Sequence, residues 1–214
     1  MSKSRTSSKQ TPTSTGVIVI VSAPSGCGKT TLVDRLLKRH PDWVRSISAT
    51  TRQPRTGEKD GQDYVFLKLE NFEEMKKNGD FLEHALVHHH WYGTPKAPVF
   101  ESYEKGKTVI LAIDIQGMLK VKEALGERFP VLTLFVLPPS LKSLRERLEG
   151  RKTEGPEEIE KRMQVAEMEI KQANLYQKTV VNQNVEQTVL EIDEMINQFR
   201  KEKEKIWDIS HLKS

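Results

Sequence analysis

The sequence predicts an α/β protein in which a parallel β-sheet lies between two layers of helices. Runs of apolar residues as short as a strand alternate with segments that have helical periodicity. The main apolar runs, residues 17–21, 108–113 and 131–137, have apolar side chains at most successive positions, so both faces of each strand are expected to be buried. Buried strands that alternate with helices are typical of a three-layer α/β fold.

The elements of this core follow one another in a regular order. A helix with Leu32, Leu36 and Leu37 at helical spacing follows the first strand and stops near His40-Pro41. The second strand leads into a helix over residues 116–125, and the third leads through Pro138-Pro139 into a helix that contains Leu141, Leu144 and Leu148. A short strand at residues 179–181 and a helix from 185 to about 207 complete the core.

Two segments interrupt this order. Residues 48–95 are richer in polar and aromatic residues, with short strands expected near 63–66 and 81–87, and are interpreted as an inserted mixed α/β subdomain. Residues 141–172 are interpreted as a helical lid, although a charged helix with a thin apolar stripe is also compatible with a plain solvated surface helix. The core then comprises residues 17–47, 96–140 and 173–214 of one domain, 17–214.

Charge and composition exclude several classes of protein. Lys3, Arg5 and Lys9 account for three of the four net positive charges, so the remaining chain carries a net charge of only +1 and offers no broad face for nucleic acid. No apolar run approaches the roughly 20 residues that span a bilayer. Residues 1–16 are expected to form a disordered tail. A single cysteine, Cys27, excludes an internal disulfide and is consistent with the cytoplasm.

A phosphate-binding loop is predicted between the first strand and its helix. The segment Ala23-Pro24-Ser25-Gly26-Cys27-Gly28-Lys29-Thr30 matches the pattern GxxxxGK[ST] except at its first position. Backbone N–H groups of such a loop surround phosphates at a helix N-terminus. We expect ATP to be bound by the following residues: Ser25, Gly26, Cys27, Gly28, Lys29, Thr30 and Thr31. Lys29 would bridge the β- and γ-phosphates, and the Thr30 hydroxyl would bind Mg²⁺.

Cys27 lies inside this loop, next to a helix N-terminus that is expected to lower the pKa of its thiol. This leaves two interpretations of Cys27. It is either a redox switch or a small residue tolerated in a loop that binds through its backbone.

A second motif follows the next strand. Arg52 and Arg55, three residues apart around a proline, are spaced to hold one phosphate, and Tyr64 could add a hydrogen bond. The segment Thr50-Thr51-Arg52-Gln53-Pro54-Arg55-Thr56-Gly57-Glu58 resembles the guanylate kinase family, as do Phe81-Leu82-Glu83 and Trp91-Tyr92-Gly93-Thr94. The similarity covers about residues 17–200 and implies a P-loop kinase that phosphorylates GMP, and also dGMP, with Mg²⁺ and ATP.

The resemblance also implies roles for individual residues. The GMP phosphate would be held by Arg52, Arg55, Tyr64 and Tyr92. The guanine base would be recognised by Ser48, Glu83, Thr94 and Asp114, with Glu83 accepting both N1–H and the 2-amino group. Without the resemblance, Asp114 would be interpreted as a magnesium aspartate. Many relatives also carry an acidic residue where this chain has Ala112.

Lid arginines complete the implied site. Arg151 and Arg162, and with less weight Arg147, match arginines that neutralise the transferred phosphoryl group, and Asn182 matches a contact to adenine. Lys29, Arg52, Arg151 and Arg162 are therefore the expected catalytic residues. Expected partners are ATP and GMP, with no nucleic acid or membrane, in a monomer or homodimer. Two alternatives remain: a non-catalytic guanylate-kinase-like module for protein interactions, and a related kinase with another phosphorylated acceptor.

Overall fold

The computed structural model describes residues 16–87, 89–150 and 155–211, with side chains described up to residue 205. Its main sheet has five parallel strands in the order β2-β7-β1-β8-β9. These strands are β1 (Val17–Ser22), β2 (Val44–Arg45), β7 (Thr108–Leu111), β8 (Val131–Leu137) and β9 (Lys178–Val181). The α/β fold with a parallel sheet is thus confirmed, and the strands predicted at 17–21, 108–113, 131–137 and 179–181 are present, the second ending two residues earlier than expected.

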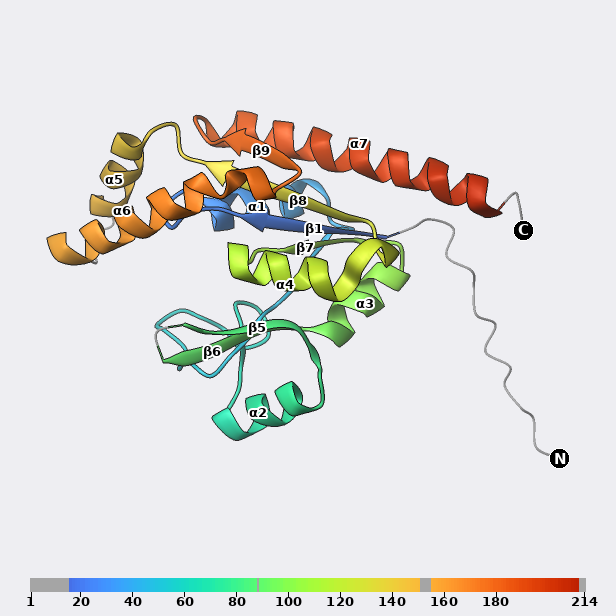
Figure 1. Cartoon of the computed structure of the whole chain (residues 1–214), viewed down its shortest axis with the longest axis horizontal. Coiled ribbons are helices and arrows are strands. Elements are labelled where there is room, and N and C mark those ends of the chain that lie inside the picture. The colour runs from blue at the N-terminus through green and yellow to red at the C-terminus, as the bar shows by residue number, and fades with distance from the viewer. Residues whose placement is uncertain (1–15, 88, 151–154, 212–214) are drawn as a thin grey trace.

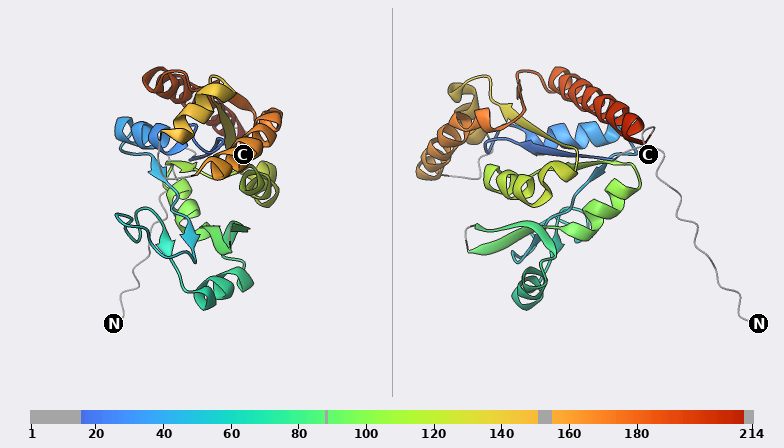
Figure 2. Two further views of the ribbon diagram at one scale, coloured as in Figure 1. Left: turned by 90° about the vertical axis from the view of Figure 1, so that its left-hand side faces the viewer. Right: turned by 45° about the vertical axis from the view of Figure 1, so that its right-hand side comes forward.

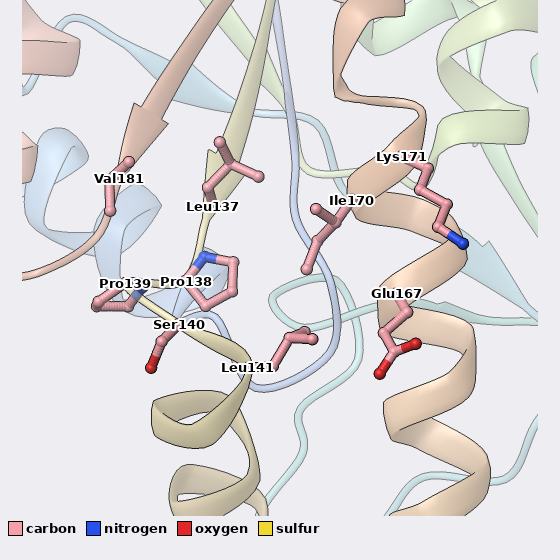
Figure 3. A pocket seen from close by; sticks show the side chains of 9 residues that line it. All are labelled: Leu137, Pro138, Pro139, Ser140, Leu141, Glu167, Ile170, Lys171 and Val181. Atoms are coloured by element: carbon pink, nitrogen blue, oxygen red, sulfur yellow. The ribbon is translucent and has the colours of Figure 1, made fainter.

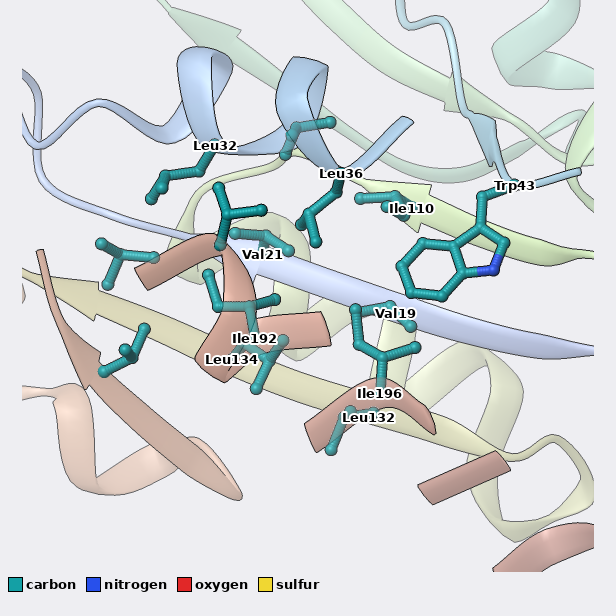
Figure 4. Close-up of a cluster of buried hydrophobic side chains, with 14 of the residues drawn as sticks. Val19, Val21, Leu32, Leu36, Trp43, Ile110, Leu132, Leu134, Ile192 and Ile196 are labelled. Carbon is teal, nitrogen blue, oxygen red and sulfur yellow. The ribbon is translucent and has the colours of Figure 1, made fainter. Parts of the chain in front are cut away.

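Helices cover both faces of this sheet (Figure 1). One face packs against α1 (Lys29–Arg39) and α7 (Val185–His211), and the other against α3 (Lys96–Glu104) and α4 (Ile115–Leu125), which a short 3₁₀ turn, η1 (Gly126–Arg128), follows. Alternate residues of β1 pack against the two helical layers. Val19 and Val21 lie in the cluster with Leu36 and Ile192 (Figure 4), and Ile18 lies in the cluster on the side of α3 and α4. The burial of both faces of β1 explains why residues 17–21 are all apolar.

A second, mixed sheet forms a smaller layer beside the core (Figures 1 and 2). Its strand order is β4-β3-β6-β5, from β3 (Ala49–Thr50), β4 (Val65–Phe66), β5 (Phe81–Val87) and β6 (His90–Pro95). Helix α2 (Leu69–Lys77) packs on it through Phe72, whose ring stacks on Phe81 at a centroid distance of 4.5 Å. The strand expected at 81–87 is present with those bounds.

The junction between the two sheets is made by α4. Lys120 of this helix donates a hydrogen bond to the backbone carbonyl of His84 in β5. Figure 2 shows the smaller sheet separated from the five-stranded sheet by the helical layer. The two sheets are therefore connected by contacts of α4, which begins directly after Asp114.

Two helices cover the carboxyl end of the main sheet. Helices α5 (Leu141–Glu149) and α6 (Pro156–Lys171) follow β8, and a 3₁₀ turn, η2 (Ala173–Leu175), leads from them into β9. Leu144 and Leu148 pack against Ile159, Met163 and Ala166, so the apolar stripe predicted for this segment is buried. Arg151, an expected catalytic residue, and residues 1–15 lie outside the described residues. Within the described part, no helix is long and apolar enough to cross a membrane.

Candidate nucleotide sites

The predicted phosphate-binding loop connects β1 to α1 at the carboxyl end of the main sheet. Gly26 and Gly28 have φ angles of 91° and 86°, which favour glycine, and Gly28 directly precedes the first residue of the helix. No side chain caps α1, so its first N–H groups point into the loop and remain available to an anion. This is the strand, loop and helix that the motif requires.

Lys29 and Thr30 occupy the first turn of α1. The Lys29 ammonium donates a hydrogen bond to the carbonyl oxygen of Ile113 at 3.2 Å, which places it beside Asp114, the residue that precedes α4. Burial lowers the pKa of Lys29, and the carboxylates of Asp114 and Glu169 oppose this shift. The side chain of Thr30 is exposed at the mouth of the loop, as is that of Thr31.

The expectation that the helix N-terminus lowers the pKa of Cys27 is wrong. The Cys27 side chain is fully buried and packs in the cluster that contains Leu144, Leu148 and Met163. Burial raises the pKa of its thiol to about 12, with Arg147 opposing the shift. A protonated, buried thiol does not fit a redox switch. Cys27 instead forms part of the contact between the loop after β1 and helices α5 and α6.

Asn182 supports the phosphate-binding loop through a side-chain hydrogen bond. Its side-chain amide donates a hydrogen bond to the carbonyl of Cys27 at 2.8 Å, and its own backbone carbonyl accepts one from Arg147 at 3.0 Å. Asn182 is 1% exposed, and its Oδ1 atom has no hydrogen-bond partner among the described residues. The expected contact of Asn182 with adenine stays a prediction. In this conformation the residue joins β9, α5 and the loop.

Replacing Gly28 by alanine is expected to reduce ATP affinity by at least tenfold. A Cβ atom at Gly28 would lie 3.0 Å from the Asn182 amide nitrogen, in a backbone conformation that alanine rarely adopts. The combined strain is about 1–2 kcal/mol, and the loop would relax away from the geometry that holds phosphate. Calorimetric titration with ATP measures the effect. Gly57→Ala serves as control, because Gly57 also has a positive φ but nothing within 4 Å.

The second predicted site lies in the smaller sheet, where Arg52 is held from several sides. Its guanidinium donates to the Tyr92 hydroxyl at 3.2 Å and to a Glu58 oxygen at 2.8 Å, and it lies over the ring of Tyr64 at 5.4 Å. The second Glu58 oxygen accepts the backbone N–H of Arg55 at 2.7 Å. The structure therefore brings Arg52, Tyr64 and Tyr92 together.

Glu58 is a site residue whose role the sequence does not show. The motif includes Glu58, but only the structure reveals that both of its oxygens organise the two arginines. The ion pair with Arg52 lowers the pKa of Glu58, chiefly through the hydrogen bond between them, and raises the pKa of Arg52. The side chain of Arg55 is exposed and is left available for an anion.

Glu83 is buried between β5 and β6. The two strands pair Glu83 with Thr94, and the Thr94 hydroxyl donates to a Glu83 carboxylate oxygen at 2.6 Å. Burial raises the pKa of Glu83 above its ordinary value, with Thr94 opposing the shift and Asp114 adding to it. Glu83 is therefore not a surface residue, although most glutamates in proteins are exposed. Asp114 caps α4 by accepting the Gly117 N–H at 2.7 Å, and Ser48 lies half-buried just before β3.

An apolar groove lies apart from these residues. It has a volume of about 430 Å³ and is lined by the end of β8, the first residues of α5, Val181 and one flank of α6 (Figure 3). Leu141 and Ile170 face each other across it, with Glu167 at its edge. None of the predicted nucleotide-binding residues lines this groove.

Comparison with known proteins places the chain in one family. The profile described as guanylate kinase matches residues 15–199. The chain is 46% identical over 182 residues to a guanylate kinase of Clostridioides difficile, covering 85% of the chain and 87% of that protein. It is 40% identical over 185 residues to one from Wolbachia sp. subsp. Brugia malayi, with 86% and 94% covered.

Solved structures agree with these relatives. The crystal structure of guanylate kinase from Anaplasma phagocytophilum superposes with a TM-score of 0.71 at 34% sequence identity, and the match covers 87% of each chain. The family match over residues 15–199 includes both sheets together with helices α5 and α6.

Proposed function

The chain belongs to the guanylate kinase family and has guanylate kinase activity, and from this premise we propose how its residues divide the work. The phosphate-binding loop takes ATP, and the site formed by Arg52, Arg55 and Glu83 takes GMP. The observation that carries this assignment is the buried Glu83 carboxylate, with one oxygen bonded to Thr94 and the remaining acceptor capacity available for guanine. We also propose dGMP as an acceptor, because none of the assigned residues requires the 2′-hydroxyl.

Magnesium fits the donor site. The exposed Thr30 hydroxyl at the start of α1 is an oxygen ligand of the kind that Mg²⁺ prefers, and Asp114 lies in the connection between the neighbouring strand β7 and α4. The described residues contain no group of three or more His, Cys, Asp or Glu side chains that could hold a metal ion. In this proposal phosphates and water supply most of the magnesium ligands. When bound, Mg²⁺ would neutralise charge on the β- and γ-phosphates.

Guanine specificity follows from the chemistry of Glu83. Guanine presents two adjacent donors, N1–H and the 2-amino group, and an ionised carboxylate accepts both. Adenine presents a lone pair at N1, which would leave the buried charge unpaired at a cost of several kcal/mol. Thr94 orients the carboxylate, and Asp114 and Ser48 complete the base pocket in this proposal.

Phosphoryl transfer in this site needs no general base, because the GMP phosphate is already an anionic nucleophile. Arg52 and Arg55 hold that phosphate, and Tyr64 and Tyr92 pack around Arg52. Lys29 and the loop N–H groups stabilise charge on the transferred group, together with Arg162, which already contacts Ser25 at 3.0 Å. Closure of the smaller sheet and the lid over the nucleotides would exclude water. Arg151 and Arg147 are proposed to join this closed arrangement.

The setting of the protein is also part of the proposal. A single buried cysteine and a guanylate kinase activity fit a cytoplasmic enzyme of purine nucleotide metabolism. We propose a monomer or homodimer that binds only small nucleotides.

GMP binding is expected to weaken in mild acid. The ionised form of Glu83 accepts the two guanine donors, and burial raises the pKa of this carboxyl. Below that pKa, the protonated form predominates, so the KM for GMP should rise about tenfold for each further unit by which the pH falls. Initial rates measured from neutral pH down into mild acid test this, with the KM for ATP as the internal reference. A KM for GMP that does not rise relative to the KM for ATP before the enzyme unfolds would contradict the role of Glu83.

The proposed reaction is tested by following ADP and GDP formation from ATP and GMP with Mg²⁺ or with EDTA. We expect equal amounts of the two products with Mg²⁺ and loss of nearly all turnover in EDTA. ADP formation without GDP would instead indicate hydrolysis, and turnover in EDTA would refute the magnesium assignment.

A further inference from the structure

Helix α6 presents two different flanks on either side of its buried stripe. Ile159, Met163 and Ala166 form the stripe, which packs against α5 and Cys27. Arg162 and Glu169 are seven residues apart, two helical turns, so they lie on the same flank. Glu167 lies about 200° around the helix from Glu169 and lines the apolar groove on the opposite flank (Figure 3).

The flank of Arg162 and Glu169 faces the phosphate-binding loop. Arg162 donates to the Ser25 hydroxyl near the start of the loop. Two turns further along α6, the half-buried Glu169 carboxylate interacts electrostatically with Lys29 at the end of the loop. Glu169 also interacts with Asp114 and with the thiol of Cys27. Helix α6 thus places the cationic side chain of Arg162 near the start of the loop and the anionic side chain of Glu169 near its end.

The Lys29 ammonium is the only cation of the loop segment 23–30, and it has two carboxylates near it. Asp114 comes from the strand end that carries Ala112, and Glu169 comes from α6. A direct hydrogen bond from Lys29 goes to a neutral acceptor, the Ile113 carbonyl. Within the part of the chain that the structure describes, no carboxylate forms a close ion pair with Lys29, so its charge is balanced by carboxylates at a distance.

We propose that Glu169 is a positioning residue that balances the charge of Lys29 while the loop holds no nucleotide, and that bound phosphates compete with this carboxylate. The inference rests on the proposed binding of ATP by the loop. Because Glu169 is part of the lid, the competition links phosphate binding to the position of α6. Phosphates favour a lid that moves Glu169 away from Lys29 and brings Arg162 closer to them.

The consequence is unusual for a residue that faces an active site: removing it should strengthen substrate binding. A carboxylate that faces the loop repels phosphates bound there, and the surrounding protein screens this repulsion incompletely. Glu169→Gln keeps the size and hydrogen-bonding capacity of the side chain and removes only the charge. We expect it to bind ATP about three- to tenfold more tightly than the wild type, with GMP affinity unchanged.

The test is calorimetric titration of the full chain with ATP in the absence of GMP, for the wild type and three variants. Glu167→Gln is the matched control, because it removes the same charge two residues away on the exposed flank, and it should bind ATP like the wild type. Glu169→Asp retains the charge and should also bind like the wild type. Thermal unfolding of each variant shows whether the fold is retained.

Each outcome decides the inference. Tighter ATP binding by Glu169→Gln alone supports it. Equal affinities of Glu169→Gln and Glu167→Gln, or weaker binding by Glu169→Gln, overturn it, because a purely structural role would loosen binding. If Glu169→Gln did not fold, Glu169→Asp would decide. Because Glu169→Asp keeps the negative charge, it should bind ATP like the wild type. Clearly tighter ATP binding by Glu169→Asp would overturn the inference. A wild type that does not bind ATP would refute the loop assignment itself, and this inference with it.

Discussion

Replacing Lys29 by methionine is expected to reduce kcat by about a thousandfold or more, because it removes the only cation of the loop segment from the transferred phosphoryl group. Methionine matches the length of the lysine stem and lacks its charge. Burial already lowers the pKa of Lys29, so the fold loses little by this replacement, and thermal stability should stay within a few degrees of the wild type. A coupled assay of ADP release measures kcat.

The control for this variant is Lys38→Met, which removes the same charge from the exposed last turn of α1. It should leave kcat within twofold of the wild type. A Lys29→Met protein that retains a tenth or more of wild-type kcat while folded would show that the loop does not act on the reacting phosphate.

The second large effect is expected at the base-binding site. Glu83→Gln should lower kcat/KM for GMP by about a hundredfold or more and leave ATP binding intact. The glutamine oxygen accepts one guanine donor, and its amide group opposes the other, so one buried donor stays unpaired. The comparison of kcat/KM for GMP with the Kd for ATP separates lost recognition from general damage.

Glu70→Gln is a suitable control, because Glu70 is exposed on α2 of the same subdomain. Its kinetics should match the wild type. If Glu83→Gln used GMP as well as Glu70→Gln does, guanine would not be recognised through this carboxylate, whatever the activity of the wild type.

Most of the fold could be predicted from local patterns. Strands β1 and β8 are apolar except for Ser22 and Thr133, which is the pattern expected of a strand buried on both faces. The loop after β1 was also predictable, since glycines at Gly26 and Gly28 meet a conformational need that the structure confirms through their positive φ angles. The shorter strands β2 and β3 have two residues each and leave no periodic signal.

Other features depend on contacts between distant segments and were beyond prediction. Cys27 was expected to be a reactive or merely tolerated thiol, whereas α5 and α6 bury it. Glu58 and Glu169 belong to charge-rich segments in which most carboxylates are solvated, and only the packing of their surroundings distinguishes them. The contact of Asn182 with adenine stays a prediction, whereas its hydrogen bond to the Cys27 carbonyl, which supports the loop, is evident only in the structure.

The most direct test of the account compares four acceptors with the wild-type chain: GMP, dGMP, AMP and UMP, each with ATP and Mg²⁺ in the coupled assay of ADP release. The account predicts rapid turnover with GMP, slower or equal turnover with dGMP, and kcat/KM for AMP and UMP lower by a hundredfold or more. Equal use of AMP and GMP would contradict the role of Glu83, and no turnover with any acceptor would contradict the kinase activity itself.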